Sequence, residues 1–209
     1  MKKILILGAS SDIGAELTKY FLVRNYKVVA HHNKNNKELK KLRSKNLQLF
    51  KFDLTKIKDF EKFVKKSNIF KDVDIFISLT GYLKIKKISQ IKSKDFIDHF
   101  NVNYLSNFVV TQKITHSMKK RNWGRILYAS SIGTKFGGSE NSFVYSLSKY
   151  MNEFFPRPLR ADYERTFFDR YVLYDIRNGE IIEVSQDDYV KFRSLRYKRS
   201  GVLSWYILG

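Results

Sequence analysis

The sequence lacks several features that define common classes of protein. It has no cysteine, so it has neither disulfide bonds nor thiolate ligands for a metal. It has no apolar run of about 18 residues, the length that a transmembrane helix needs. The opening stretch "ILILGAS" has only about six apolar residues before it turns polar, so it indicates a strand and not a signal peptide. These absences favour a globular protein of the reducing cytoplasm.

Acidic residues and prolines are also scarce. Twenty Asp and Glu stand against 40 Lys and Arg, for a net charge of +20, and the only prolines are Pro156 and Pro158. Residues 1–155 hold 26 Lys and 4 Arg against 12 acids, whereas residues 156–209 hold 2 Lys and 8 Arg against 8 acids. Composition therefore changes where the prolines interrupt the chain, and this predicts a boundary between 1–155 and 156–209.

The excess of lysine has two interpretations. Lysines scattered over helices are typical of a solvated surface, and that is the interpretation we favour. A binding surface for nucleic acid or another polyanion is the alternative, and it predicts binding that weakens as salt is added.

The first 155 residues alternate short apolar runs with amphipathic segments. This rhythm is typical of a doubly wound parallel sheet, an α/β fold of Rossmann-like type. The predicted strands are 3–8, 27–32, 47–53, 73–79 and 124–130; the predicted helices are 12–25, 37–45, 57–66, 93–101, 105–120 and one that begins near 143.

The last 54 residues follow a different pattern. Residues 170–176 and 180–185 flank Asn178-Gly179, a dipeptide that favours a hairpin turn. A helix over 186–199 and a strand over 201–209 complete a small ββαβ-like tail. Because 124–130 would otherwise be an exposed edge strand, we expect 171–176, 202–208 or a second subunit to cover it.

A glycine-rich turn follows the first strand, in "GASSDIG" (8–14). Gly8 permits a tight turn and Gly14 permits close packing of the next helix. The amino terminus of that helix then offers free N–H groups to a pyrophosphate. Asp12 stands where a middle glycine is common, so an ordinary turn remains an alternative.

The end of the second strand bears on the choice of coenzyme. It lacks the Asp or Glu that would bind a ribose 2′-hydroxyl. His32, Asn33 and Lys34 stand there instead and are suited to a 2′-phosphate. NADP is therefore preferred over NAD, and a polar loop without a ligand is the alternative.

Three further residues suggest acid–base chemistry. Tyr145 and Lys149 are four residues apart and share one face of a helix. A nearby ammonium is expected to lower the pKa of the tyrosine and to tune it as a proton donor. Ser131, after the fifth strand, is placed to hydrogen-bond the same substrate oxygen.

Together these stretches resemble the short-chain dehydrogenase/reductase family over residues 1–155. The matching motifs are "GASSDIG", "FDLT" (52–55), "NVNY" (101–104), "GRILYASS" (124–131) and "YSLSK" (145–149), in the order of that family. The strand-four motif is only partly kept, in "SLTG" (78–81), which retains Gly81.

The resemblance implies a role for each matching residue. Tyr145 would be the acid or base, with Ser131, Lys149 and Asn103 completing the catalytic group. Lys149 would also bind the nicotinamide ribose, and Asp53 would approach the adenine. The implied coenzyme contacts are Gly8, Ser10, Ser11, Asp12, Ile13, Gly14, His32, Asn33, Lys34, Asp53, Leu54, Gly81, Tyr145 and Lys149.

The resemblance also implies a function, although it ends at Pro156. It implies an NAD(P)-dependent oxidoreductase that moves a hydride between the nicotinamide and a carbonyl or alcohol, and a homo-oligomer. Nothing after Pro156 resembles the family's substrate-covering region, so the sequence predicts a C-terminally truncated fold. The alternative is a non-catalytic nucleotide-binding or interaction protein.

The four histidines show no metal-site spacing, and we expect no metal, membrane or nucleic-acid partner.

Overall fold

The computed structural model describes residues 1–153, 171–175, 180–184 and 205–208. The strands are β1 (Lys3–Leu7), β2 (Lys27–His32), β3 (Leu47–Lys51), β4 (Ile75–Ser78), β5 (Arg125–Ala129), β6 (Tyr171–Asp175), β7 (Glu180–Val184) and β8 (Trp205–Leu208). The helices are α1 (Asp12–Val23), α2 (Lys37–Lys41), α3 (Ile57–Lys66), α4 (Ser93–Phe100), α5 (Ser106–Lys120) and α6 (Phe143–Tyr150). Short 3₁₀ turns cover Asn68–Phe70, Ile88–Gln90, Ile132–Lys135 and Met151–Glu153.

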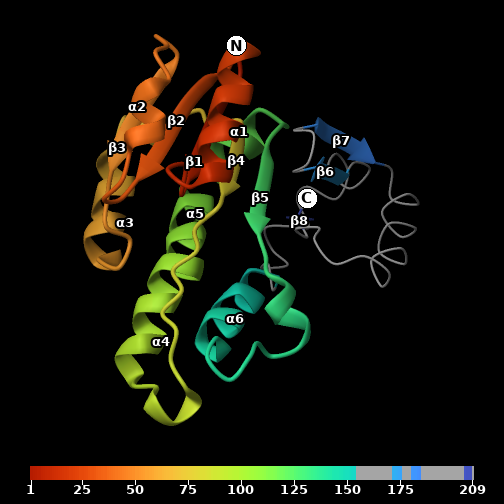
Figure 1. The fold of residues 1–209 in the computed structure, drawn as a ribbon. Helices are drawn as coiled ribbons and strands as arrows, with labels where there is room; N and C mark the ends of the chain where they lie inside the picture. Colours follow the sequence, from red (N-terminus) through yellow and green to blue (C-terminus); the bar gives the residue numbers. More distant parts are fainter. Residues whose placement is uncertain (154–170, 176–179, 185–204, 209) are drawn as a thin grey trace.

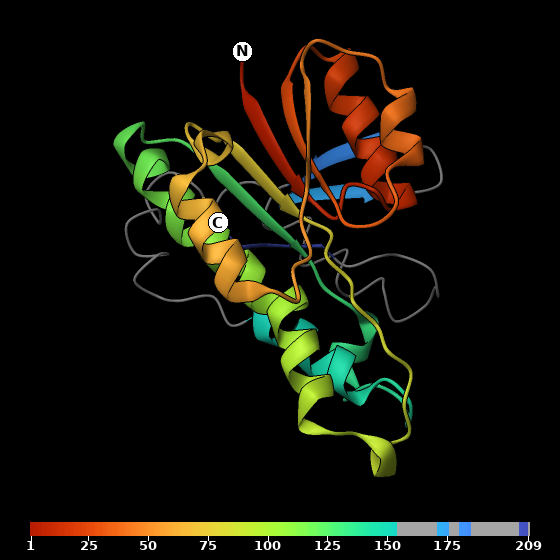
Figure 2. The same cartoon turned by 90° about the vertical axis from the view of Figure 1, so that its left-hand side faces the viewer.

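The strands form a sheet in the order β3-β2-β1-β4-β5-β8 (Figure 1). The first five are parallel, as the alternating pattern predicts. Helices α1 and α2 lie on one side of this sheet, and α3 and α5 lie on the other (Figure 2). The predicted doubly wound, Rossmann-like fold is therefore confirmed.

The two sides of the sheet carry separate apolar cores. Successive residues of β1 point to opposite faces: Ile4 and Ile6 pack with Phe21 of α1, whereas Leu5 packs with Ile114 of α5. All of β1 from Ile4 to Leu7 is fully buried. This explains the unbroken apolar run at the start of the sequence, since a strand covered on both faces has no polar side.

Helices α4 and α5 differ from the prediction of two separate helices. They are joined by a π-helical turn over Asn101–Leu105, so that one long rod runs past the end of the sheet (Figure 1). A π turn adds one residue to a helical turn, and it often marks a functional site. The periodicity of the sequence does not predict this extra residue.

The edge of β5 is covered by the tail, which was one of the predicted alternatives. Strand β8 pairs antiparallel with β5, with Leu208 opposite Ile126 and Trp205 opposite Ala129. Strands β6 and β7 form the predicted antiparallel hairpin. The helix predicted over 186–199 lies outside the described residues. No helix in the described part of the chain is both long and apolar enough to span a membrane.

Candidate functional site

The glycine-rich turn lies at the carboxyl ends of the parallel strands, which we call the carboxyl edge. Gly8 has a φ of 75°, and a Cβ there would lie 2.9 Å from the carbonyl carbon of Leu79. A Cβ on Gly14 would lie 2.6 Å from Ala9 Cα. The Ser11 hydroxyl accepts a hydrogen bond from the Gly14 N–H at 3.1 Å and caps α1. Both glycines are therefore required sterically, and the turn leads directly into the amino terminus of a 12-residue helix.

His31 supports this turn, a role that no motif of the sequence indicates. Its Nδ1 accepts a hydrogen bond from the Gly8 N–H at 3.1 Å, and its Nε2 donates to the Phe52 carbonyl at 3.0 Å. The ring is therefore neutral, with its proton on Nε2. Burial lowers the pKa of His31 to about 4. This buried ring joins the glycine turn to the end of β3.

The three residues predicted to bind a 2′-phosphate have different surroundings. Asn33 and Lys34 are exposed after the end of β2. His32 is buried, and its ring is already used within its own loop: Nδ1 lies 3.1 Å from the Asn33 carbonyl and Nε2 lies 3.4 Å from the Asn36 amide nitrogen. Of the three, Lys34 is the exposed cation.

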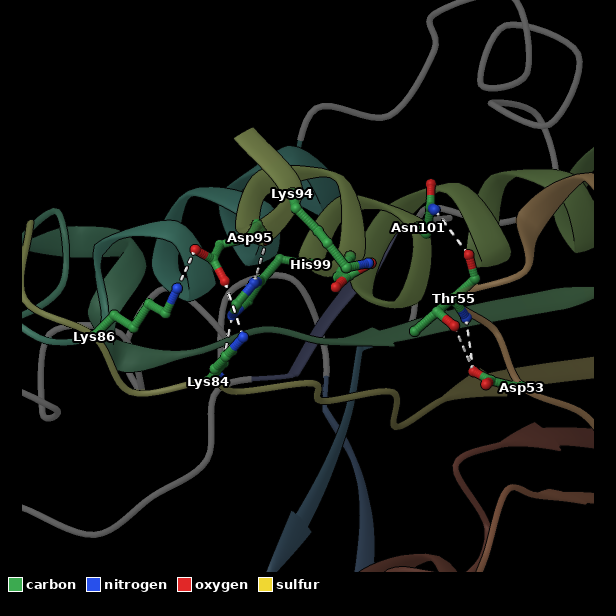
Figure 3. A network of polar contacts seen from close by, with 9 residues as sticks. Asp53, Thr55, Lys84, Lys86, Lys94, Asp95, His99 and Asn101 are labelled. Atoms are coloured by element: carbon green, nitrogen blue, oxygen red, sulfur yellow. Dashed lines mark hydrogen bonds and ion pairs between the residues drawn. The ribbon is translucent and has the colours of Figure 1, made fainter. Parts of the chain in front are cut away.

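Asp53 follows β3, one strand further along the same edge. Its Oδ1 accepts hydrogen bonds from the Thr55 N–H at 3.1 Å and the Thr55 hydroxyl at 2.8 Å. The Asn101 amide donates to the Thr55 carbonyl at 2.9 Å and ties this loop to the long helical rod (Figure 3). Leu54, which lies between Asp53 and Thr55 in the sequence, is buried. Asp53 is thus held rigidly, with its second carboxylate oxygen free of these bonds.

The predicted catalytic residues come together at the carboxyl ends of β4 and β5. A Cβ on Gly81 would lie 3.9 Å from the Tyr145 hydroxyl oxygen. The Lys149 Nζ lies 5.9 Å from the centre of the Tyr145 ring. The hydroxyl of Ser131 interacts with Tyr145 and acts to lower its pKa.

The pKa of Tyr145 is shifted in the direction opposite to the one predicted from the sequence. Burial raises the pKa of the phenol above its usual value, and the interaction with Ser131 opposes that rise only in part. The expectation that Lys149 lowers this pKa is therefore wrong for the protein as the structure shows it. The reason is geometric, because the ammonium is directed at main-chain carbonyls.

Lys149 spans the ends of two strands. Its Nζ donates hydrogen bonds to the carbonyl oxygens of Thr80 and of Ala129, the latter at 3.0 Å. Burial lowers the pKa of Lys149 to about 8. An ammonium has three N–H donors, so one donor is left for a ligand at this edge.

Asn103 sits in the π-helical turn and is completely buried. Its side-chain oxygen accepts from the Tyr82 N–H at 2.7 Å, and its amide nitrogen donates to the Tyr82 carbonyl at 3.0 Å and to the Ser148 hydroxyl at 2.9 Å. The π turn thereby ties the loop after Gly81 to α6, which carries Tyr145 and Lys149. Asn103 thus fixes the position of this loop relative to α6.

A second group of contacts, which no motif of the sequence indicates, holds the loop 81–92. The buried carboxylate of Asp95 accepts from Lys86 Nζ at 2.6 Å, Lys84 Nζ at 3.2 Å and the Lys92 N–H at 3.0 Å (Figure 3). These bonds, with that of Lys86 the strongest, hold the pKa of Asp95 well below its usual range. His99 accepts from the Lys84 N–H at 3.3 Å.

Taken together, the fold and this edge define a class of protein: a Rossmann-like α/β protein with a glycine-rich turn and a Ser–Tyr–Lys group at one edge of its sheet. The family model described as short chain dehydrogenase matches residues 2–167. The chain therefore belongs to the short-chain dehydrogenase family. The match runs past residue 155, where the sequence predicts a boundary, so the division into domains stays a prediction.

Curated relatives are similar over most of this chain. A hydroxynaphthalene reductase-like protein, Arp2, of Metarhizium acridum is 28% identical over 169 residues, which are 77% of this chain and 62% of that protein. The uncharacterized oxidoreductase YvrD of Bacillus subtilis is 27% identical over 139 residues, 64% of this chain and 53% of that protein. The chain thus spans less than two thirds of the length of these relatives.

Solved structures share the fold. A structure titled "ElxO with NADP Bound" has a TM-score of 0.66 and 22% identity, and covers 78% of this chain and 68% of its own. An actinorhodin polyketide ketoreductase variant with NADPH has a TM-score of 0.67 and 23% identity, and covers 79% and 66%. Within the described residues, no three His, Asp or Glu side chains are grouped as a metal site would require.

Proposed function

We propose that the chain is an oxidoreductase that prefers NADP(H), with a carbonyl or alcohol as its substrate and Tyr145 as the acid or base. The observation that carries the proposal is the position of the Tyr145 hydroxyl. It lies beside Gly81 at the edge where the glycine turn opens α1. Family membership and the relatives described as reductases support the same reaction class.

The residues at the carboxyl edge fit a dinucleotide. The space beside Gly8 and Gly14 lies at the amino terminus of α1, where N–H groups and the helix dipole favour a pyrophosphate. Lys34 is the exposed cation for a 2′-phosphate, and Asp53 lies at the next strand end toward the adenine. The third N–H of Lys149 is the donor for the nicotinamide ribose. NADP(H)-bound structures with the same fold support this choice.

In the proposed reaction, the nicotinamide supplies or accepts the hydride. In the direction of reduction, the Tyr145 hydroxyl donates its proton to the substrate oxygen while Ser131 hydrogen-bonds the same oxygen. Burial raises the pKa of Tyr145, so at neutral pH the phenol carries the proton that it donates. Lys149 is held beside Tyr145 by its hydrogen bonds to the Thr80 and Ala129 carbonyls, where it would position the nicotinamide ribose.

The test combines binding and turnover in the full chain. Calorimetric titration with NADPH and then NADH measures the coenzyme preference, and a panel of aldehydes and ketones measures turnover. We expect Tyr145→Phe to lower turnover by roughly 10²- to 10⁴-fold and to leave NADPH binding nearly unchanged. Tyr150→Phe, an exposed tyrosine of the same helix, is the matched control and should have no effect.

Two outcomes would contradict the proposal. Turnover that survives in Tyr145→Phe would remove the role of that residue. Tight NADPH binding without turnover of any carbonyl would favour the alternative, a nucleotide-binding protein that is not an enzyme.

A further inference from the structure

A hollow lies at the opposite edge of the sheet, where the parallel strands begin, which we call the amino edge. Its volume is about 590 Å³, within the range that small-molecule sites occupy. It opens beside the first residues of β1, β2 and β3 and the loop before β4. Strands of five residues separate it from the glycine turn by about 17 Å. This hollow is therefore distinct from the proposed coenzyme site.

Positive charge predominates around this hollow. Its lining includes five basic side chains and two acidic ones, with three amide side chains between them. The basic residues are Lys3, Lys27, Lys45, Lys71 and Arg121; the acidic residues are Asp72 and Asp74; the amides are Asn46, Gln48 and Asn68.

Both carboxylates are already engaged. Asp74 accepts from the Lys3 main-chain N–H at 2.8 Å and from Arg121 Nη2 at 3.2 Å. Asp72 accepts from Arg121 Nη1 at 3.4 Å. Arg121 takes part in both ion pairs, and both carboxylates also act on the Lys3 ammonium, whereas Lys27, Lys45 and Lys71 form no ion pair with them.

Three of the lysines form no ion pair in the described part of the chain. Lys27, Lys45 and Lys71 are exposed, and none of them forms an ion pair with a described carboxylate. The Lys3 ammonium donates to the Lys71 carbonyl at 2.8 Å.

These lysines also repel one another. Lys3 and Lys27 are register neighbours on adjacent parallel strands, so two like charges face the same hollow side by side. Burial lowers the pKa of Lys3 and the charge of Lys27 acts in the same direction, whereas the charges of Asp72 and Asp74 oppose this shift in part. A bound anion would relieve this repulsion.

We propose that the amino-edge hollow binds a compact phosphate-bearing anion, independently of the coenzyme. The lysines come from four separate segments that meet at one concave place, which suits a compact ligand better than an extended nucleic-acid strand. The amides of Asn46 and Gln48 add hydrogen-bond donors beside them. At physiological salt the screening length is about 8 Å, so charges at the two edges act independently.

The experiment uses the full chain and inorganic triphosphate as the probe. Calorimetric titration at low salt, and again at about 0.15 M ionic strength, should show one saturable site that weakens with salt. The double variant Lys27→Glu/Lys71→Glu should weaken binding by about tenfold or more. The matched control Lys58→Glu/Lys62→Glu makes the same change of charge on the exposed face of α3 and should bind as the parent does.

Location and independence are tested separately. In amide NMR spectra, triphosphate should shift the signals of Val28, Asn46 and Leu47, which line the hollow, and spare that of Gly14. Saturating NADPH should not displace the triphosphate. Thermal unfolding of both double variants checks that they fold.

The results that would overturn the proposal are distinct from a failure of the proposed function. Equal weakening of triphosphate binding in both double variants would mean that binding depends only on the net charge of the chain. Displacement of triphosphate by NADPH would place the anion at the carboxyl edge. An oligonucleotide that binds more tightly than triphosphate, and loses affinity equally in both variants, would show a non-specific polyanion surface. Absence of saturable binding at low salt would remove the site altogether.

Discussion

Lysines at the two edges of one sheet have opposite surroundings. At the carboxyl edge, Lys149 is buried and donates to two main-chain carbonyls, and its pKa is lowered to about 8. At the amino edge, Lys27, Lys45 and Lys71 are exposed and pair with no carboxylate of the described residues. The ammonium of Lys149 is held in place by its hydrogen bonds to the protein, whereas the exposed ammonium groups of Lys27, Lys45 and Lys71 can contact a ligand. All four residues carry the same charge, so the difference between them comes from which end of the strands each one lies at.

The largest expected effect is on the carboxyl edge. Replacing Lys149 by Met removes the buried ammonium, and turnover should fall by roughly 10²-fold or more. In the parent protein, turnover should also decline above about pH 8, as the ammonium loses its proton. Steady-state rates over pH 6–10 measure both effects. The comparison between the edges would fail if Lys149→Met also weakened triphosphate binding at the amino edge.

The next effect concerns the glycine turn. A methyl group at Gly14 would lie 2.6 Å from Ala9 Cα, so Gly14→Ala should cost about 1–3 kcal/mol of the free energy of unfolding and abolish coenzyme binding. Urea unfolding and NADPH titration measure the two losses. Lys19→Ala, at an exposed position of the same helix, is the control and should change stability by less than about 0.5 kcal/mol. Unimpaired NADPH binding by Gly14→Ala would show that the turn is not the coenzyme site.

A smaller and pH-dependent effect comes from His31. Its pKa is about 4 in the folded chain against 6.5 in a free histidine, so protonation favours unfolding. The stabilisation is full above pH 6.5 and is lost as the pH falls toward 4. Between pH 7 and pH 5 the loss should be about 2 kcal/mol.

His31→Phe tests this assignment. The variant removes the acceptor for Gly8 and the donor to Phe52, and it should lose about 1–3 kcal/mol at pH 7. It should also lose the pH dependence between pH 7 and pH 5. His116→Gln, at an exposed position of α5, is the control and should keep that dependence. Equal pH dependence in His31→Phe and the parent would contradict the neutral, buried ring.

The smallest effect is local and concerns the loop 81–92. Asp95→Asn weakens the contacts with Lys84 and Lys86, so the amides of Tyr82 and Lys84 should exchange with solvent faster. Hydrogen exchange followed by NMR measures this directly. Asp98→Asn, which removes the neighbouring pair with Lys94 on the same helix, should leave the loop unchanged. Equal exchange in both variants would mean that the loop is held by other contacts.

Much of the fold was predictable because its signals are local. The apolar run of β1 and the alternation of short strands with amphipathic segments predicted five parallel strands, and the structure confirms them. Gly8 and Gly14 were predicted as the glycines of the turn, since close backbone contacts exclude any side chain there. The sequence also predicted that Tyr145 and Lys149 share a helix face.

Other features were not predictable because they depend on contacts between distant segments. The direction of the Lys149 ammonium is set by the carbonyls of Thr80 and Ala129, which lie 69 and 20 residues away along the chain. The π turn at Asn103 and helix α4 both pack against α6, which lies about 45 residues further along the chain. Neither contact has a signature in a short window of sequence.

Local sequence patterns account for the strands that form, the turn at the end of β1 and the residues that are available for chemistry, because periodicity and glycine placement act over a few residues. Three other features arise from the folded arrangement: β8 covers β5, burial raises the pKa of Tyr145, and lysines from four segments meet at the amino edge. Burial and electrostatic potential are sums over neighbours in space, and those neighbours exist only once the chain has folded.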